Sequence, residues 1–146
     1  MIASLAYWAR VQTEMQADTR ERTGELIGLL TSVAAEISVN ERTLDRLIEE
    51  PHRLVAPAER VLETEYWDRN GLGVARAIGN YGTFSPIAQY YEYVQRLREG
   101  VEQGATTRDS VEELIWNAQA CRQQGSFVQG HIFRYLSSIM NTELAK

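Results

Sequence analysis

Few residues of this chain have the type and spacing that metal chemistry needs. Its two histidines are His52 and His131, and Glu49-x-x-His52 has the spacing that di-iron helical bundles use. Such a site needs a Glu-x-x-His from each of two helices and further carboxylates. Pro51 lies inside this motif, and no glutamate stands three residues before His131. We therefore predict no metal site and interpret both histidines as surface or interface residues.

Nucleophilic chemistry has equally little support. Cys121 is the single cysteine, so an intrachain disulfide is impossible, which suits a reducing compartment. Its neighbours Ala120 and Arg122 supply no activating base, and Cys121 falls on the apolar stripe of its helix, so we predict a buried core residue. No Cys-x-x-Cys, His-Glu-x-x-His or phosphate-binding glycine loop occurs. We predict no catalytic residue and no cofactor, with an enzyme kept as the third alternative.

Two polar residues lie on an otherwise apolar helical stripe. Glu36 and Asn40 are one turn apart, and both fall on the inner face of the helix that contains them. A buried amide must find hydrogen-bond partners. Asn40 is therefore expected either to fix the register of packed helices, the favoured interpretation, or to hold a ligand or water.

The middle of the chain is rich in aromatic residues. A core arranged around the corner at residues 79–84 is the favoured interpretation, and a small-molecule pocket is the alternative. In the pocket interpretation Tyr81, Tyr90 and Tyr91 join Glu36 and Asn40 as candidate site residues. The aromatic residues concerned are Tyr66, Trp67, Tyr81, Phe84, Tyr90, Tyr91 and Tyr93.

One long helix must carry Glu36 and Asn40. An unbroken heptad seam predicts that this helix packs along its length against other helices. We expect it to end at Glu50, because Pro51 cannot continue it. A helix of about 30 residues is roughly 45 Å long, so we expect an elongated bundle. The seam positions are Leu26, Leu30, Val33, Ile37, Asn40, Leu44 and Leu47.

Proline and glycine signals divide the middle of the chain. Pro57 suits the first turn of a helix that Asn70-Gly71 should stop, and 72–78 should form a short helix. Ser85-Pro86 predicts the start of the next helix, which Gly104 should end. Its expected buried face is Ile87, Tyr90, Tyr91, Val94, Leu97 and Val101.

A second heptad seam predicts the last helix. It opens at a capping box beginning at Asp109. One helix over 109–141 is favoured over two helices that break at Gly125, because the seam passes through Gly125 unchanged. Its positions are Leu114, Ala118, Cys121, Gly125, Val128, Ile132, Tyr135 and Ile139.

These elements predict an all-α fold, because no stretch alternates with the period of a strand. We expect residues 1–146 to form a single helical domain, an elongated antiparallel bundle of about four main helices and one short helix. With a net charge of −5 and no basic run, the chain is a poor candidate for binding nucleic acid.

The first residues, 1–18, need a separate interpretation. They are apolar near the start and contain Tyr7 and Trp8, but no stretch approaches the about 20 apolar residues that span a bilayer. A peripheral membrane helix, or the remnant of an anchor, is one interpretation. Packing on the bundle or pairing with another copy is favoured, because interfacial helices usually carry several cations and Arg10 is alone here.

The run Leu30-Thr-Ser-Val-Ala-Ala-Glu-Ile-Ser-Val-Asn-Glu-Arg-Thr-Leu44 resembles the "LLxEIxxN…L" helix of many small bacterial helical proteins that have no known activity. Trp67, Leu72, Ile78-Gly79, Ile87, Tyr90-Tyr91 and Leu97 are similar to the second half of those proteins. A transmembrane helix commonly precedes the motif in that group, whereas residues 1–11 here are too short to span. The resemblance implies a bacterial helical domain close to a membrane and transfers no site residues.

The leading hypothesis is a non-enzymatic helical interaction domain that self-associates or binds another helical protein. We expect it in the cytoplasm, with the inner face of a membrane as an alternative location. The second hypothesis is a ligand-binding sensor bundle whose aromatic pocket includes Tyr81, Tyr90, Tyr91 and Asn40.

Overall fold

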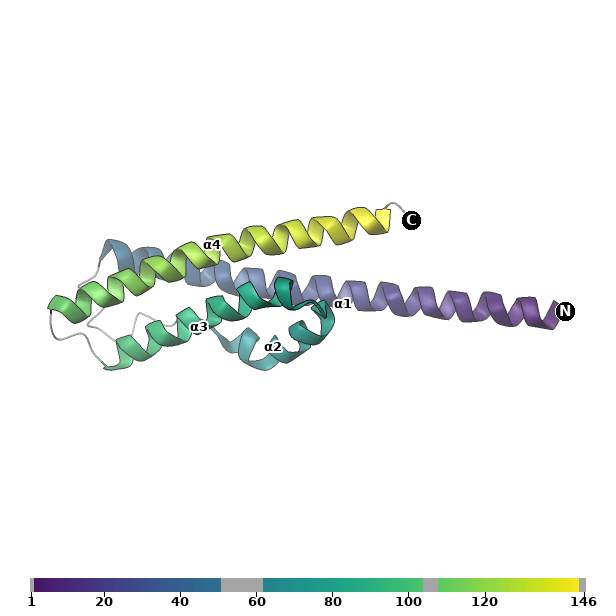
Figure 1. The fold of residues 1–146 in the computed structure, drawn as a ribbon, viewed down its shortest axis with the longest axis horizontal. Coiled ribbons are helices and arrows are strands. Elements are labelled where there is room, and N and C mark those ends of the chain that lie inside the picture. The colour runs from purple at the N-terminus through teal and green to yellow at the C-terminus, as the bar shows by residue number, and fades with distance from the viewer. Residues whose placement is uncertain (1, 51–61, 104–107, 145–146) are drawn as a thin grey trace.

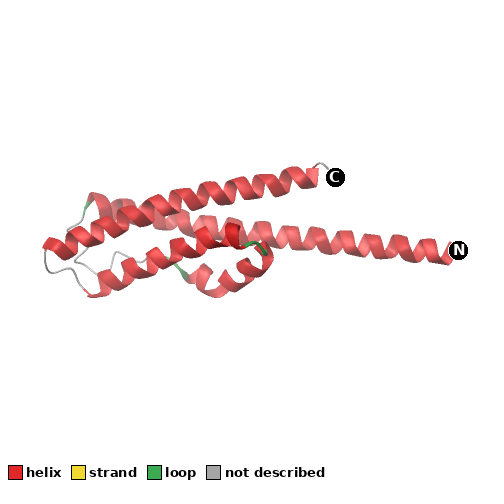
Figure 2. Ribbon diagram, viewed as in Figure 1, coloured by secondary structure: helices red, strands yellow, loops and turns green. Residues whose placement is uncertain are grey.

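The computed structural model describes residues 2–50, 62–103 and 108–144, and these contain four helices and no strand (Figure 2). The helices are α1 (Ile2–Glu49), α2 (Glu65–Ile78), α3 (Tyr81–Gln103) and α4 (Arg108–Leu144). The start of α1 and the end of α4 lie at the same end of the molecule, so the two long helices are antiparallel (Figure 1). The predicted all-α, elongated, antiparallel bundle is confirmed.

The predicted seam of α1 is buried, but the helix is longer than expected. Every seam residue from Leu26 to Leu47 is at most 8% exposed, including Asn40 at 0%. The helix has 48 residues, which corresponds to about 72 Å. Its start projects beyond the bundle (Figure 1). The polar run before Leu26 is part of the same helix.

The last helix is continuous through Gly125, as predicted. Gly125 is buried where α4 meets both α1 and α3. A Cβ atom at this position would lie 3.1 Å from Cε2 of Tyr90 and 3.5 Å from Cγ2 of Ile37. The missing side chain therefore lets the three helices approach closely, and no kink or break is needed.

The predicted stop at Asn70-Gly71 is wrong. Helix α2 continues through both residues and ends at Gly79, whose φ of 64° is the left-handed cap conformation. Asn70 donates a hydrogen bond to the Tyr66 carbonyl at 3.1 Å instead of leaving the helix. Burial of Val74 and Ile78 explains the continuation, because it outweighs the propensity cost of about 1 kcal/mol at the glycine. The separate short helix predicted over 72–78 is thus the second half of α2.

The predicted helix start at Ser85-Pro86 is also wrong. Helix α3 begins at Tyr81, and Pro86 lies inside it. Asn80 provides the cap, since its Oδ1 accepts a hydrogen bond from the Gly82 N–H at 2.9 Å. Because Asn80 caps the chain first, the helix begins before Ser85-Pro86. Pro86 lies close to the helix start, where it removes one backbone N–H donor. The helix start predicted at Pro57 lies outside the described residues.

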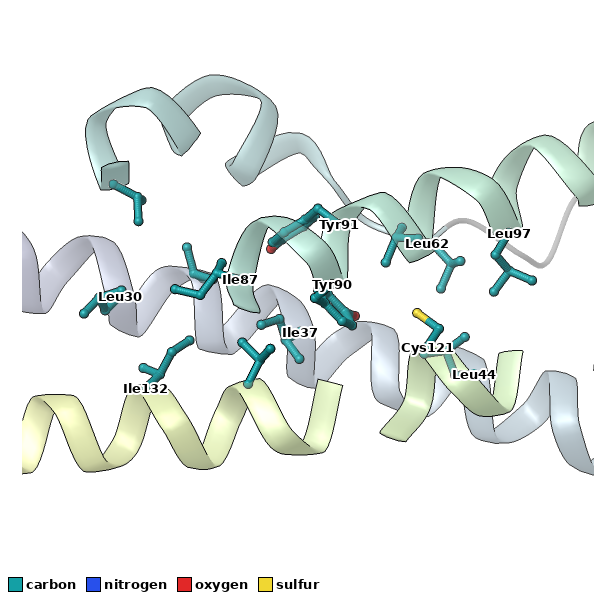
Figure 3. Packing of buried hydrophobic residues seen from close by; sticks show 14 of the residues in the cluster. Leu30, Ile37, Leu44, Leu62, Ile87, Tyr90, Tyr91, Leu97, Cys121 and Ile132 are labelled. Atoms are coloured by element: carbon teal, nitrogen blue, oxygen red, sulfur yellow. The ribbon is translucent and has the colours of Figure 1, made fainter. Parts of the chain in front are cut away.

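The core runs along the middle of the bundle, where α1, α3 and α4 meet (Figure 3). Side chains such as Leu30 and Ile37 from α1, Ile87 and Tyr90 from α3, and Ile132 from α4 point toward one another there. Helix α2 lies against α1 and α3, and it adds Val74 and Ile78 to this core. The arrangement fixes the inner face of α1 beside the start of α2.

Candidate functional site

The Glu36 carboxylate lies at the N-terminus of α2 and caps it from another helix. Its Oε2 accepts a hydrogen bond from the Tyr66 N–H at 2.8 Å, and its Oε1 accepts one from the Trp67 N–H at 3.3 Å. Oε1 also accepts a hydrogen bond from the Tyr91 hydroxyl at 2.6 Å. A negative charge here satisfies backbone donors and favours the positive end of the helix dipole. Thr64, the local cap residue, makes no side-chain cap hydrogen bond.

Asn40 holds the chain just before α2. Its Oδ1 accepts a hydrogen bond from the Glu63 N–H at 2.6 Å, and its Nδ2 donates to the Glu63 carbonyl at 2.8 Å. The fully buried amide therefore binds both the N–H and the carbonyl of Glu63, one with each of its polar atoms. Together, Glu36 and Asn40 fix the direction in which residues 63–67 enter α2.

Thr64 and Arg98 add a second polar contact at the same place. Arg98 of α3 donates from Nη1 to the Thr64 hydroxyl at 2.7 Å, and that hydroxyl donates to Oδ2 of Asp68 at 3.0 Å. The start of α2 is thus bound to α1 through Glu36 and to α3 through Arg98.

Aromatic rings cover this polar network. Trp67 stacks on Tyr91 with ring centroids 4.6 Å apart and on Phe84 at 5.7 Å. Burial, and then the hydrogen bond to Glu36, raise the pKa of Tyr91 well above its usual value. The Tyr91 hydroxyl therefore stays protonated and remains a donor throughout the neutral range.

Tyr90 and Tyr81 lie in opposite environments. The Tyr90 side chain is fully buried, and its hydroxyl makes no hydrogen bond within the part of the chain that the structure describes. Burial raises the pKa of Tyr90, and the nearby Cys121 adds to this effect. Tyr81 is 80% exposed. The structure therefore brings Glu36, Asn40, Tyr90 and Tyr91 into one region and leaves Tyr81 outside it.

A shallow groove of about 490 Å³ lies beside the network, between α1 and the start of α2, and we call it the α1–α2 groove. Val39 in its wall is 51% exposed. An ion pair between Arg69 and Glu65, 2.9 Å apart, lies along it. The groove is lined by Ala35, Glu36, Val39, Glu63, Glu65, Tyr66, Arg69 and Asn70.

Arg122 joins α4 to α1 through a contact that the sequence analysis missed. Its Nε donates to Oδ1 of Asp45 at 2.9 Å, and its Nη2 donates to Oε1 of Glu41. The two acidic residues are one turn apart on the same face of α1. That spacing was visible in the sequence, but nothing local identified Arg122 as the partner.

Cys121 is buried at 0% exposure, as predicted. Burial raises the pKa of its thiol to about 12, so the thiolate needed for nucleophilic attack is scarce at neutral pH. Among the described residues, no group of three or more His, Cys, Asp or Glu side chains is placed to hold a metal ion. His52 of the Glu49-x-x-His52 motif lies outside these residues.

Replacing the buried amide by an acid tests the Asn40 contact. At neutral pH, Asn40→Asp would place a carboxylate oxygen against the Glu63 carbonyl, so we expect a loss of about 2–3 kcal/mol in unfolding free energy. A protonated carboxyl could donate to that carbonyl. The loss relative to the parent should therefore shrink as the pH falls from 7 toward 4, because the folded state then binds the extra proton more tightly. Urea unfolding of both proteins at each pH measures this difference, and a pH-independent loss would contradict it.

No protein-family model, no curated protein and no solved structure matches this chain. In the described residues, none of the helices combines the length and the apolar character needed to cross a bilayer. The resemblance to small bacterial helical proteins stays a prediction.

Proposed function

We propose that this chain is a non-enzymatic helical interaction domain that acts by self-association or by binding another helical protein. The observation that carries the proposal is the solvent-accessible surface area of the chain. The chain exposes 10018 Å², whereas a compact monomer of 16.6 kDa is expected to expose about 7,600 Å². The difference of about 2,400 Å² reflects the elongated shape of the bundle, and it leaves room for an interface to which one partner contributes roughly 800 Å².

The chemistry of the buried polar groups supports this proposal. Glu36 and Asn40 are engaged by the chain's own backbone, and Tyr91 donates to Glu36. The thiol of Cys121 stays protonated. These groups stabilise the fold. The exposed faces of the long helices are therefore the surface that we propose a partner binds.

Mass measurement in solution tests the proposal. We expect native mass spectrometry and sedimentation equilibrium at tens of micromolar to show a dimer or a larger oligomer, or a stable complex with a helical partner. A monomer that captures no protein from the lysate of a bacterial host would overturn the proposal.

A ligand-binding sensor is the second candidate, and the α1–α2 groove is the observation that favours it. The groove combines the exposed apolar side chain of Val39 with the nearby Arg69–Glu65 ion pair. A retained small molecule would appear as an extra mass in the same native spectrum, and Val39→Trp should remove it by filling the groove. A bare spectrum for the gently purified parent would count against the sensor.

The cellular location also stays a proposal. We place the domain in the cytoplasm, with the inner face of a membrane as the alternative that the resemblance suggests. Fractionation of cells that express the full chain distinguishes the two, because a membrane-bound form would sediment with the membranes and be released by detergent.

A further inference from the structure

The outer face of α4 carries a line of four exposed residues, Asp109, Trp116, Phe127 and Arg134, which we call the α4 stripe. Their spacing along the helix brings them to within about 20° of one another around its axis. Trp116 is 66% exposed and Phe127 is 53% exposed. The residues by which α4 joins the core lie on the other side of the helix. The second half of α4 forms one edge of the molecule, with α1 and α3 on its inner side (Figure 1).

The order of the four residues is self-complementary. Asp109 and Trp116 lie as far before the midpoint of the stripe as Arg134 and Phe127 lie after it. If a second α4 runs antiparallel across this midpoint, Trp116 of each copy lies opposite Phe127 of the other. In the same register, Asp109 of each copy lies opposite Arg134 of the other. One surface thus supplies both sides of the contact, as an interface with two-fold symmetry requires.

We propose that the α4 stripe is the surface by which this chain pairs with a second copy of itself, with the two α4 helices antiparallel. The inference rests on the proposed function and names the surface that carries it. Each dimer then contains two tryptophan–phenylalanine contacts, which are favourable between aromatic rings. It also contains two carboxylate–guanidinium pairs.

Charge favours the antiparallel orientation. A parallel pair in register would set Asp109 opposite Asp109 and Arg134 opposite Arg134, so like charges would meet at both ends. The exposed side chain of Glu113, one turn after Asp109, makes the first end of the stripe more acidic. The antiparallel pair brings this acidic end to Arg134 of the second copy, which makes the two surfaces complementary.

The geometry of α4 leaves room for this pair. Pairing about the midpoint overlaps residues 108–135 of both copies, which all belong to α4. The overlap is about 42 Å long and about 10 Å wide, so each copy contributes on the order of 400 Å² of helix face. That is about half of a standard contribution, and we therefore expect a dimer with a micromolar dissociation constant. The inner faces of the two α4 helices point away from each other, so each bundle lies on its own side of the pair.

The Phe127 ring is held in place before any partner binds. It stacks on His131, one turn further along α4, with ring centroids 6.1 Å apart and an angle of 12° between the rings. More than half of Phe127 remains exposed. A ring that is already ordered loses less side-chain freedom on association, which favours binding.

Substitution of Trp116 tests the surface against a matched control. Trp8 of α1 is 64% exposed, close to the 66% of Trp116, and lies outside α4. We expect Trp116→Ala to raise the dimer dissociation constant about tenfold or more in sedimentation equilibrium, and Trp8→Ala to leave it unchanged. Circular dichroism checks that both variants keep their helices.

Charge reversal tests the orientation. In the antiparallel pair, Arg134→Asp sets two aspartates opposite each other at both ends, so we expect the dissociation constant to rise about fivefold or more. Adding Asp109→Arg to the same chain restores opposite charges, and the dissociation constant should return close to that of the parent. A general folding defect would not be corrected by this second change. In a parallel pair, the single and the double variant would both associate like the parent, and this result would overturn the proposal.

The outcomes separate this inference from the proposed function. A dimer that Trp116→Ala does not weaken, or that Trp8→Ala weakens equally, would overturn the inference while self-association stands. A monomeric parent that binds a different helical protein would also overturn the inference and keep the proposed function. A monomer that binds no protein would overturn both.

Discussion

Glu36→Ala should lower the free energy of unfolding by about 3 kcal/mol or more, a large part of the total for a domain of this kind. The substitution leaves the N–H groups of Tyr66 and Trp67 and the hydroxyl of Tyr91 without their acceptor. The hydrogen bond from the Tyr91 hydroxyl is buried and those from the two N–H groups are partly buried, so water replaces the lost bonds only in part. We expect the thermal midpoint to fall by about 10 °C, measured by circular dichroism.

Two further variants identify the cause of this loss. Glu36→Gln keeps the volume of the side chain but removes the charge and replaces one acceptor oxygen by a donor, so it should lose most of the same stability. Glu25→Ala, an exposed glutamate on the same helix, should stay within about 0.5 kcal/mol of the parent. If Glu36→Gln were as stable as the parent, the contribution of Glu36 would be packing rather than capping.

Gly125→Leu is expected to have the second large effect. A Cβ atom alone at this position would lie 3.1 Å from the Tyr90 ring, so a larger side chain must displace α3 or α1. Overpacking of this kind costs about 3 kcal/mol. The substitution should lower the thermal midpoint by about 10 °C, and near-ultraviolet circular dichroism should show altered packing of the tyrosines.

Gly130 on the same helix is the matched control, because a Cβ atom there would meet no other atom within 4 Å. Gly130→Leu should be neutral or stabilising by up to about 1 kcal/mol, since leucine favours the helix over glycine. Equal stability of the two leucine variants would show that α4 is not closely packed at Gly125 in solution.

The helices could be predicted from the sequence wherever burial repeats with the helical period. The seams from Leu26 to Leu47 and from Leu114 to Ile139 identified the two long helices, and the second seam carried the prediction through Gly125. Helix ends were less predictable. Asn70-Gly71 and Ser85-Pro86 are strong local signals, but burial of Val74 and Ile78 and the earlier cap at Asn80 decided the real boundaries.

The polar network could be predicted only in part. The position of Glu36 and Asn40 on a buried stripe showed that both need partners. Their partners are about 23 to 55 residues away in the sequence, and hydrogen bonds at such separations leave no local pattern to recognise. Sequence reasoning also grouped Tyr81 with Tyr90 and Tyr91 by proximity, whereas α3 directs Tyr81 into solvent.

The continuity of α1 couples the angular direction of its two ends. Because the helix has no break between Ile2 and Glu49, the direction in which its first part, residues 2–25, faces is fixed by the face that packs in the bundle. Inserting one residue near Gly24 would turn the part of the helix before it by about 100° and shift that part by about 1.5 Å. Inserting seven residues would nearly restore the original direction and move it outward by about 10 Å. The rotation of this helix about its axis, more than its length, therefore determines which face is presented to a partner.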